Sequence, residues 1–508
     1  MTVRVSQTVG LRAALLAGCL GLLGALALAP KLGEQELGNA GASVFRISGR
    51  DMSKWAREFE TPLPIVEIVV EDVRLPRPDE VEVPALVRVF DRPGIHRLAD
   101  APRAVLPFAK VRHRGKTSMH PQFRQKSIRL GVLDEKQRPS RFDLCGFAPD
   151  DDFALIACAM DRSLVRDRVA RELAAPLFPW VPRSRYVEVF LRRASDRLDE
   201  ETYRGVYLAS ETASAGPGRI EAGDLEAVGE FRGLDGGGWA VRRDRAMPGR
   251  PGFTIGGEEY QLVSPGGSEA TAEALDWVRD DFARFRAKIR EQATGEDLGE
   301  WLDLGTFVDM MLLQELVKNR DAFIFSAYYW RPAGGRMAAG PPWDYNLAMG
   351  NSEGFTGPEG LIVPGRELAG HLLRRPEIFG RFCGRWAELR KPGGAFSDGK
   401  IEEAVAAAAA EAGPGARRHF ARHPELLHPR RKFVLNVNYG ADTFEENVRI
   451  VREFLLRRAR WMDGALGGMA GPDDLFSGEM ASALAESEAR GIGWWTGEEP
   501  PSAEEGMR

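Results

Sequence analysis

Residues 340–351 read GPPWDYNLAMGN, a stretch in which an acid and an amide stand two positions apart between bulky apolar residues. In an extended chain alternate side chains share a face, so Asp344 and Asn346 would point to one side and their apolar neighbours to the other. Such a pair suits a hard cation such as Mg²⁺, which takes one or two protein carboxylates together with water and phosphate oxygens. The alternative is a strand end whose Asp caps the next turn.

A second acid, Asp321, follows an apolar segment upstream of this stretch. Residues 307–319, FVDMMLLQELVKN, are apolar nearly all round, which is typical of a helix buried inside a domain. Segments 326–330 and 335–341 then flank a Gly-Gly turn, which predicts a β-hairpin that ends at Asp344. One acid therefore precedes the hairpin and one follows it. Kinase-type phosphoryl-transfer enzymes use this order for a catalytic Asp and a Mg²⁺-binding Asp.

A lysine and a glutamate earlier in the chain fit the same order. Lys126 opens the predicted strand KSIRLGV, and Glu172 lies on the helix predicted at residues 162–176. A strand lysine paired with a helix acid positions the α and β phosphates in such enzymes. Either residue alone is more often a solvated surface group, so the order along the chain carries the argument.

The predicted elements change in character along the chain. Short β-branched or aromatic runs predict five strands in the first part, at residues 64–73, 84–91, 126–132, 186–191 and 203–210. Helical spacing of apolar residues dominates the second part, within residues 275–289, 307–319, 401–412 and 444–462. We therefore expect an α+β fold with two lobes. The smaller lobe is a mostly antiparallel sheet with the helix at 162–176 packed against it, and the larger lobe is mainly helical.

Composition excludes several classes of function. The 508 residues are 44% hydrophobic and 28% charged with a net charge of −5, so nothing favours nucleic acid as a partner. The seven histidines show no metal-ligand spacing, and no nucleophile-elbow pattern supports hydrolase chemistry. Asp244, in the stretch WAVRRD, could approach the cleft but is assigned no role. The sequence gives no indication of the oligomeric state.

The N-terminus predicts export. Residues 13–29 are uncharged and largely apolar, follow Arg4 and Arg12, and end at Pro30, which indicates a signal peptide or a short membrane anchor. The preceding arginines favour a cytoplasmic N-terminus, so the rest of the chain is expected outside the cytoplasm. The alternative is a lipoprotein cleavage box, LAGC, with Cys19 as the lipidated residue.

Four ordered blocks resemble the spore-coat CotH kinase family of atypical, kinase-like proteins. They are RGKTS with RQKSIRL, MDRSLVRDRVARELA with PRSRYVEVFL and YRGVYLASE, ELVKNRDAFIFSAYYW, and GPPWDYNLAMGN. The resemblance covers roughly residues 60–470. It implies a kinase-like fold, ATP and Mg²⁺ as cofactors, and phosphorylation of Ser or Thr hydroxyls of a protein substrate.

The resemblance also implies roles for single residues. It makes Asp321 the catalytic acid, Asp344 a metal ligand and Lys126 the phosphate-binding lysine. It further suggests that Arg114 and Gly115 lie near the nucleotide and that Glu211 lies near the hinge.

One position departs from the kinase pattern. Kinase-type loops carry a metal-binding Asn five residues after the catalytic Asp, and here that position holds Ser326. A hydroxyl is a weaker Mg²⁺ ligand than an amide oxygen, and Asn346 could supply the missing amide.

The resulting domain prediction has four parts. They are a signal or anchor at 1–30, a linker at 31–60, a kinase-like domain at 61–470 with lobes at about 61–215 and 216–470, and an acidic tail at 471–508. Two classes of function stay open, a protein Ser/Thr phosphotransferase and a non-catalytic envelope or surface binding protein on the same scaffold. Transfer of another group, such as AMP, is a third.

Overall fold

The structure is a computed structural model that describes residues 51–121, 123–222, 237–247, 249–266, 270–291, 295–427 and 441–476. The predicted signal or anchor, the linker up to residue 50 and the tail from residue 477 lie outside the described residues. The described chain divides into two compact units. The barrel unit comprises 51–157, 185–211 and 414–423, and the helical unit comprises 158–184, 212–413 and 424–476.

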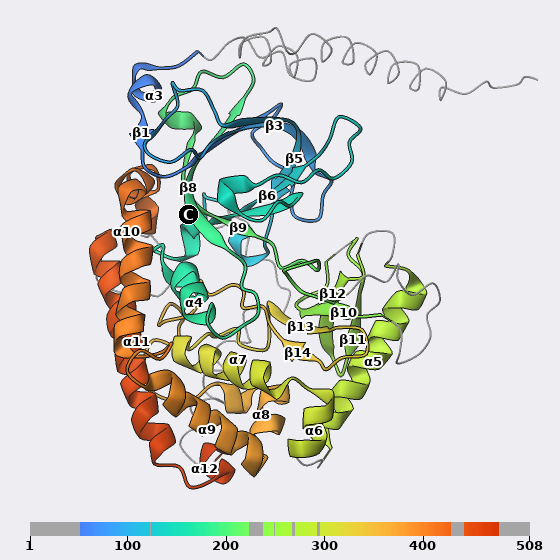
Figure 1. Cartoon of the computed structure of the whole chain (residues 1–508). Coiled ribbons are helices and arrows are strands. Elements are labelled where there is room, and N and C mark those ends of the chain that lie inside the picture. Colours follow the sequence, from blue (N-terminus) through green and yellow to red (C-terminus); the bar gives the residue numbers. More distant parts are fainter. Residues whose placement is uncertain are drawn as a thin grey trace, which may run out of the picture. The chain divides into compact units, whose positions relative to one another are not determined.

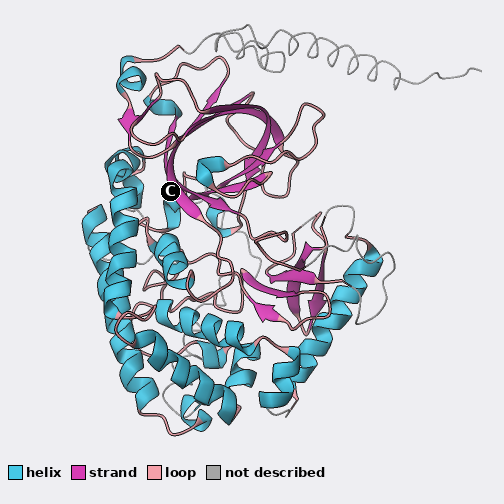
Figure 2. Ribbon diagram, in the orientation of Figure 1, coloured by secondary structure: helices cyan, strands magenta, loops and turns pink. Residues whose placement is uncertain are grey.

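Seven strands of the barrel unit close on themselves in the order β2-β3-β5-β6-β7-β9-β8, drawn as a ring in Figure 2. Pairs from β2 through β9 are antiparallel, whereas β2 and β8 pair in parallel from Ile65↔Glu188 to Val70↔Arg193. The strands, labelled in Figure 1 where space permits, are β2 (Ile65–Val70), β3 (Val83–Phe90), β5 (Ala104–His113), β6 (Ile128–Val132), β7 (Asp152–Ala157), β8 (Ser184–Arg193) and β9 (Tyr203–Glu211).

Alternation of side chains along the strands fills the barrel. On β2, Val66, Ile68 and Val70 join one apolar core with residues of the other six strands. Ile65 faces the other way and packs with Phe59 and other aromatic residues outside the ring. Short elements complete this unit, namely α3 (Lys54–Glu58), β1 (Glu60–Thr61), β4 (His96–Arg97), and the 3₁₀ turns η2 (Thr117–Met119), η3 (Leu144–Gly146) and η5 (Glu200–Thr202).

The helical unit contains a sheet as well as helices. Its five strands pair antiparallel in the order β11-β12-β10-β13-β14. The strands are β10 (Trp239–Arg243), β11 (Gly252–Ile255), β12 (Glu258–Ser264), β13 (Ala327–Arg331) and β14 (Ala338–Ala339). The helices are α4 (Arg166–Ala174), α5 (Ala272–Arg290), α6 (Gly295–Trp301), α7 (Leu304–Val317), α8 (Glu367–Leu373), α9 (Pro376–Arg390), α10 (Asp398–Arg422), α11 (Phe444–Gly467) and α12 (Pro472–Phe476), with 3₁₀ turns η4 (Cys158–Met160), η9 (Val363–Gly365) and η10 (Pro424–Leu426). From Pro414 onward, α10 belongs to the barrel unit.

The predicted helices of this unit are present as α4, α5, α7, α10 and α11, and two of them show clear local sequence causes. Helix α7 is buried almost all round, as its unbroken apolar sequence requires, and begins where the Asp303 side chain accepts from two backbone N–H groups. Helix α5 buries Val278, Phe282 and Ile289 on one face, the face that the helical spacing predicts.

The expected fold class was wrong in its architecture, although α+β describes the composition correctly. Instead of a small, mostly antiparallel sheet there is a closed seven-stranded barrel, and the second unit, which was expected to be mainly helical, carries a five-stranded sheet. Helix α4 was expected on the small sheet but belongs to the helical unit, where it contacts α7. Barrel closure depends on the parallel β2–β8 pair, whose partners are more than 100 residues apart in the sequence. Local sequence patterns do not indicate a pairing between strands that are so distant.

The end of α10 docks on the barrel through buried polar contacts. Arg418 forms a bidentate pair with the fully buried Glu188, at 2.9 and 2.8 Å. The Val206 N–H donates to Nδ1 of His419 at 3.1 Å, and His419 is completely buried. Because an imidazole nitrogen that accepts a hydrogen bond must lack a proton, this contact requires neutral His419.

We predict that His419 makes the fold sensitive to acid. Burial lowers its pKa well below the ordinary value, with a further lowering by His423. The unfolded chain therefore takes up this proton first, near pH 6.5, and the free energy of unfolding should fall by up to about 1.4 kcal/mol per pH unit below that value. In His419→Asn, whose side-chain oxygen replaces the acceptor, this part of the pH dependence should disappear. Urea denaturation between pH 7.5 and 5.5 measures both slopes, and equal slopes would contradict the prediction.

Candidate functional site

The candidate site of the helical unit begins where α7 ends. Lys318 is the C-cap of α7 and adopts the left-handed conformation, with φ of 46°, which ends the helix. The Asn319 side chain then accepts from the Asp321 N–H at 3.2 Å. The Asp321 carbonyl accepts from the Ile324 and Phe325 N–H groups at 2.9 and 3.0 Å. Asp321 is therefore fixed by its backbone at the start of a tight turn.

Opposing charges surround the Asp321 carboxyl. Burial is the largest effect and raises its pKa, and the neighbouring Asp244 raises it further. Arg320, Arg366 and Arg245 act in the opposite direction without cancelling the shift. A carboxylate whose pKa is raised while it stays close to several cations is a stronger proton acceptor than an ordinary Asp, which suits a general base.

Arg366 is a positioning residue for this turn. It is buried, and its guanidinium donates to the Arg320 carbonyl at 2.8 Å. Arg320 in turn donates to the Ser352 hydroxyl at 3.3 Å. Arg320, the residue before Asp321, is therefore held by Arg366 and by Ser352, which directly follows the GPPWDYNLAMGN stretch.

The second acid comes together with both other predicted metal ligands. Asp344 Oδ1 accepts from Nδ2 of Asn346 at 2.8 Å, and Asp344 Oδ2 accepts from Oγ of Ser326 at 3.4 Å. Asp344 is not in an extended strand, because β14 ends at Ala339 and the φ of Asp344 is 66°. The alternation expected for this stretch is therefore wrong, although the left-handed backbone still brings the Asp344 and Asn346 side chains together.

Helix α4 and its preceding turn hold the Asp344 loop in place. Asp167 accepts from the Tyr345 N–H at 3.0 Å, and the buried Arg166 donates to the Ala348 and Met349 carbonyls at 3.1 and 3.4 Å. Nδ2 of Asn351 bonds the carbonyl of Asn346 at 2.6 Å. The sequence blocks MDRSLVRDRVARELA and GPPWDYNLAMGN therefore bind each other.

These residues fit a magnesium ion by the chemistry of their donors. A carboxylate, an amide and a hydroxyl supply only hard oxygen ligands, as Mg²⁺ prefers. A 180° flip of the Asn346 side-chain amide exchanges its oxygen and nitrogen, so the oxygen would take the position from which Nδ2 now donates to Asp344. Over the described ranges, His, Cys, Asp and Glu side chains do not gather in threes as a metal cage would require. A site with a single carboxylate agrees with that finding, since Mg²⁺ completes its shell with water and phosphate oxygens.

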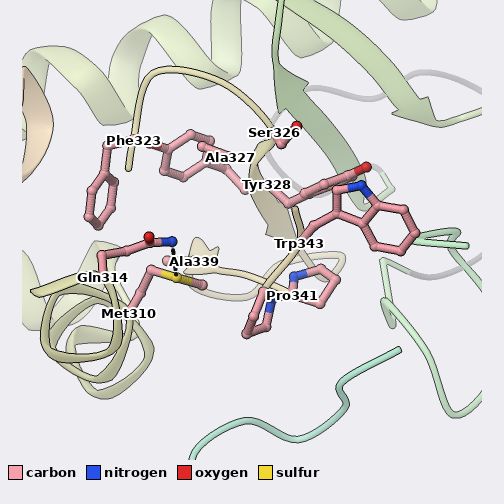
Figure 3. Close-up of a pocket in the computed structure, with 11 residues that line it drawn as sticks. Met310, Gln314, Phe323, Ser326, Ala327, Tyr328, Ala339, Pro341 and Trp343 are labelled. Carbon is pink, nitrogen blue, oxygen red and sulfur yellow. Dashed lines mark hydrogen bonds between the residues drawn. The ribbon is translucent and has the colours of Figure 1, made fainter. Parts of the chain in front are cut away.

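A small pocket adjoins this group, shown in Figure 3. Ser326 and Trp343 line one part of it, and Met310 and Gln314 of α7 line another. Its enclosed space is that of about one water molecule. The pocket is therefore too small for a nucleotide.

The barrel unit contains four of the predicted nucleotide-site residues. Lys126 precedes β6, and its Nζ donates to the His120 carbonyl at 2.5 Å. Burial lowers the pKa of Lys126 to about 8. The Arg114 N–H donates to the carbonyl of Ser127, the residue next to Lys126, at 2.9 Å. The structure thus brings Arg114 and Lys126 to neighbouring positions in the barrel.

Two further residues of that unit have defined surroundings. Gly115 has φ of +88°, and a Cβ atom there would lie 2.3 Å from Oγ of Ser118, so the turn requires glycine. Glu211 ends β9, is fully buried, and accepts from the Ala148 N–H at 3.3 Å. Its place near a hinge stays a prediction.

Glu172 lies on α4 in the helical unit and forms an ion pair with Arg168 one turn earlier. Lys126 belongs to the other unit, and each unit is described by itself. The pairing of Lys126 with Glu172 stays a prediction.

A family model for CotH kinase protein matches residues 111–462, which is more than half of the chain. The chain belongs to the CotH kinase protein family. A comparison with curated proteins found no match. Family membership makes this a kinase-like protein and agrees with nucleotide and metal use in general. None of the helices in the described part of the chain combines the length and hydrophobicity that a membrane span requires.

Sequence reasoning missed the arginines beside Asp321 and assigned no role to Asp244, which also acts on its carboxyl. Strand β10 pairs with β13, and Arg243 lies opposite Ala327, the residue after Ser326. The stretch WAVRRDR contained the signal, a dense run of charges at a strand end. The strand that pairs with it is about 85 residues away, so the sequence did not indicate which loop these charges would reach.

We predict that the buried pair of Glu315 and Arg458 stabilises the last turn of α7, the helix that precedes Asp321. Both side chains are fully buried and 2.7 Å apart, and Glu315 also accepts from the Ile362 and Val363 N–H groups. Arg458→Met should leave the carboxylate unpaired and lower the free energy of unfolding by about 3–5 kcal/mol. The double variant Glu315→Gln with Arg458→Met removes both charges and should be less destabilised. Urea denaturation of the three proteins decides, and equal losses for the single and double variants would contradict this account.

Proposed function

We propose that this kinase-like protein is an ATP- and Mg²⁺-dependent phosphotransferase that acts on Ser or Thr hydroxyls of a protein substrate. The observation that carries the proposal is the convergence of Ser326, Asp344 and Asn346, with Asp321 held at the start of the turn that leads to Ser326. An acid for proton transfer and an oxygen-rich metal site, in this order, are the two parts that phosphoryl transfer needs from the protein.

Each group has a defined task in this proposal. Asp321 accepts the proton of the substrate hydroxyl, whose oxygen forms a bond to the γ phosphorus as the bond to the ADP oxygen breaks. Asp344, Asn346 and Ser326 hold Mg²⁺, which supplies positive charge for the phosphate oxygens when bound. Lys126, Arg114 and Gly115 of the barrel unit contribute to nucleotide binding in this proposal, with Glu172 as the partner of Lys126 and Glu211 near the hinge.

A specific observation favours the second candidate, a non-catalytic binding protein on this scaffold. Within their own units, Lys126 donates to the His120 carbonyl and Glu172 pairs with Arg168, so each side chain already has a contact other than the one that an active kinase requires of it. The same site would then bind a nucleotide or a partner without transfer.

We predict that Asp344 and Asp321 affect different steps. Asp344→Ala should abolish Mg²⁺-dependent ATP binding, because the only carboxylate of the proposed metal site is lost. Asp321→Asn should retain that binding and lower the transfer rate by about 10²–10⁴-fold, because the general base is removed. Isothermal titration calorimetry measures binding, and phosphate incorporation into a Ser-containing protein measures transfer.

The matched control is Asp280→Ala, which removes an exposed acid on α5 of the same unit. It should leave both quantities unchanged. Unaltered Mg²⁺ and ATP binding in Asp344→Ala, or no binding by the wild type, would reject the phosphotransferase and leave the non-catalytic alternative.

We also propose that the domain acts outside the cytoplasm, either exported or held at the membrane by residues 13–29. The proposal rests on the apolar composition of that segment and the arginines before it. Alkaline phosphatase joined after Pro30, which is active only outside the cytoplasm, should be active, and a cytoplasmic reporter at the same place should not. The reverse pattern would contradict export.

A further inference from the structure

A second pocket of the helical unit adjoins the candidate site. It has a volume of about 120 Å³, much more than the space beside Ser326. Ala339 and Pro341 line both pockets. Pro341 stands three residues before Asp344. Both pockets therefore contact the segment that leads to the predicted metal ligand.

Aromatic side chains form much of the wall of this second pocket, which we call the aromatic pocket. Phe178 and Trp180 follow α4 in the chain, and Trp330 belongs to β13. Phe178 is buried and packs against Gly340, where a Cβ atom would lie 3.3 Å from the Phe178 ring. Trp180 and Trp330 are only half-buried. Part of their apolar surface can therefore still be covered by a bound group.

Hydrogen bonds keep another wall of the aromatic pocket in place. The Gly216 N–H donates to the Ile220 carbonyl at 3.1 Å, which closes a tight turn. Arg219 donates to the Ser214 hydroxyl at 3.0 Å, and its guanidinium lies 5.9 Å from the centroid of the Trp180 ring. Arg219 is therefore part of the framework of the pocket, which is formed before anything binds.

The mouth of the aromatic pocket has no single sign of charge. Pro179, Gly218 and Glu221 are exposed, so within the described part of the chain the pocket opens to solvent on this side. The charged side chains in its lining, Arg219 and Glu221, have opposite signs. Neither a cation nor an anion is therefore attracted by a field of one sign. The charge balance favours a neutral, apolar occupant.

The volume limits the size of that occupant. A cavity of about 150 Å³ lined by apolar side chains binds one benzene ring, whereas sites for larger ligands have about 300–1,000 Å³. The aromatic pocket therefore has room for one ring and not for a whole nucleotide. Aromatic walls suit a ring well, because edge-to-face and offset contacts between rings are favourable beyond the area that they bury.

We propose that the aromatic pocket binds one Trp, Tyr or Phe side chain of the protein substrate. The inference rests on the proposed phosphotransferase function and adds a substrate class, namely proteins that carry an aromatic residue within reach of the acceptor Ser or Thr. The position favours a polypeptide as the occupant, because the pocket adjoins the proposed site of transfer. A chain anchored there by its ring raises the local concentration of its own hydroxyl at that site.

The test uses peptides that carry a single Ser and, at increasing distances from it, a Trp, Gly, Lys or Glu residue. Binding of the labelled peptides to the full-length protein is measured by fluorescence polarisation, and phosphate incorporation gives kcat and KM. At the best distance, the Trp peptide should bind at least about tenfold more tightly than the other three. The gain should be in KM, with kcat unchanged, because the ring does not touch the reacting atoms.

Trp180→Ala and Trp330→Ala should each remove most of this preference, because each takes away one aromatic wall. The matched control is Trp277→Ala, which removes a half-buried ring of α5 in the same unit and should keep the preference. Thermal melting shows whether each variant is folded. Trp180 and Trp330 lie on different segments, so either variant tests the pocket if the other is not folded.

The outcomes separate this inference from the proposed function. Trp-dependent binding that is lost in Trp180→Ala, without phosphate incorporation into any peptide, would support the pocket as a polypeptide site and contradict the phosphotransferase. Equal binding of the Trp and Gly peptides would overturn the inference. Displacement of the Trp peptide by ATP would also overturn it, because the pocket would then belong to the nucleotide site.

Other occupants would be recognised in the same experiment. Free indole that binds while every Trp peptide fails to bind would assign the pocket to a small aromatic ligand and overturn the inference. A concentration-dependent dimer in analytical ultracentrifugation, lost in Trp180→Ala, would assign the pocket to a second copy of the chain and overturn it as well.

Discussion

The buried guanidinium of Arg166 is the contact on which the Asp344 loop depends. It is completely buried, pairs with Asp161 at 2.5 Å, and donates to two carbonyls of the 340–351 stretch. A buried charge is tolerated only when its partners are fixed, so Asp161 and the loop must keep their positions together. The next residue, Asp167, holds the Tyr345 N–H and so fixes the backbone directly after Asp344. Helix α4 thereby determines where the predicted metal ligand lies.

Some elements of the fold could be predicted from local sequence patterns, and others could not. The helices α5 and α7 could be predicted because their apolar spacing is complete within one segment. The five predicted strands in the first part are all present, but β5 and β7 were not predicted. Both are needed to close the barrel, along with the parallel pair of β2 and β8. Pairing between distant strands is a property of the whole chain, and for this reason a mostly antiparallel sheet was expected where a closed barrel exists.

Some residues of the candidate site could likewise be predicted from local sequence, and others could not. The convergence of Ser326, Asp344 and Asn346 could be predicted because these residues flank one hairpin and follow a known order. Asp244 and the arginines beside it could not, because they reach Asp321 through the pairing of β10 with β13. The roles of Lys126 and Glu172 stay predictions, because their contacts are resolved only within their own units. Sequence order thus led to the prediction of the acids, whose roles stay predictions, and only the tertiary structure shows the arginines around Asp321.

Two arginines near Asp344, Arg171 and Arg242, constrain how a metal could bind there. The Asp344 carboxylate already acts on the Arg171 and Arg242 guanidiniums. Burial lowers the pKa of Arg171 and the Asp344 charge opposes that shift only in part, whereas the pKa of Arg242 is raised, despite burial, by Tyr328, Asp244 and Asp344. Arg171 also lies 4.9 Å from the centroid of the Trp343 ring, next to Asp344. A divalent cation added at Asp344 would be repelled by both arginines, and this repulsion offsets part of the attraction to a single carboxylate. Anionic oxygens bound at the same time would remove that cost. The charges of this unit therefore favour joint binding of Mg²⁺ and phosphate groups over binding of the metal alone.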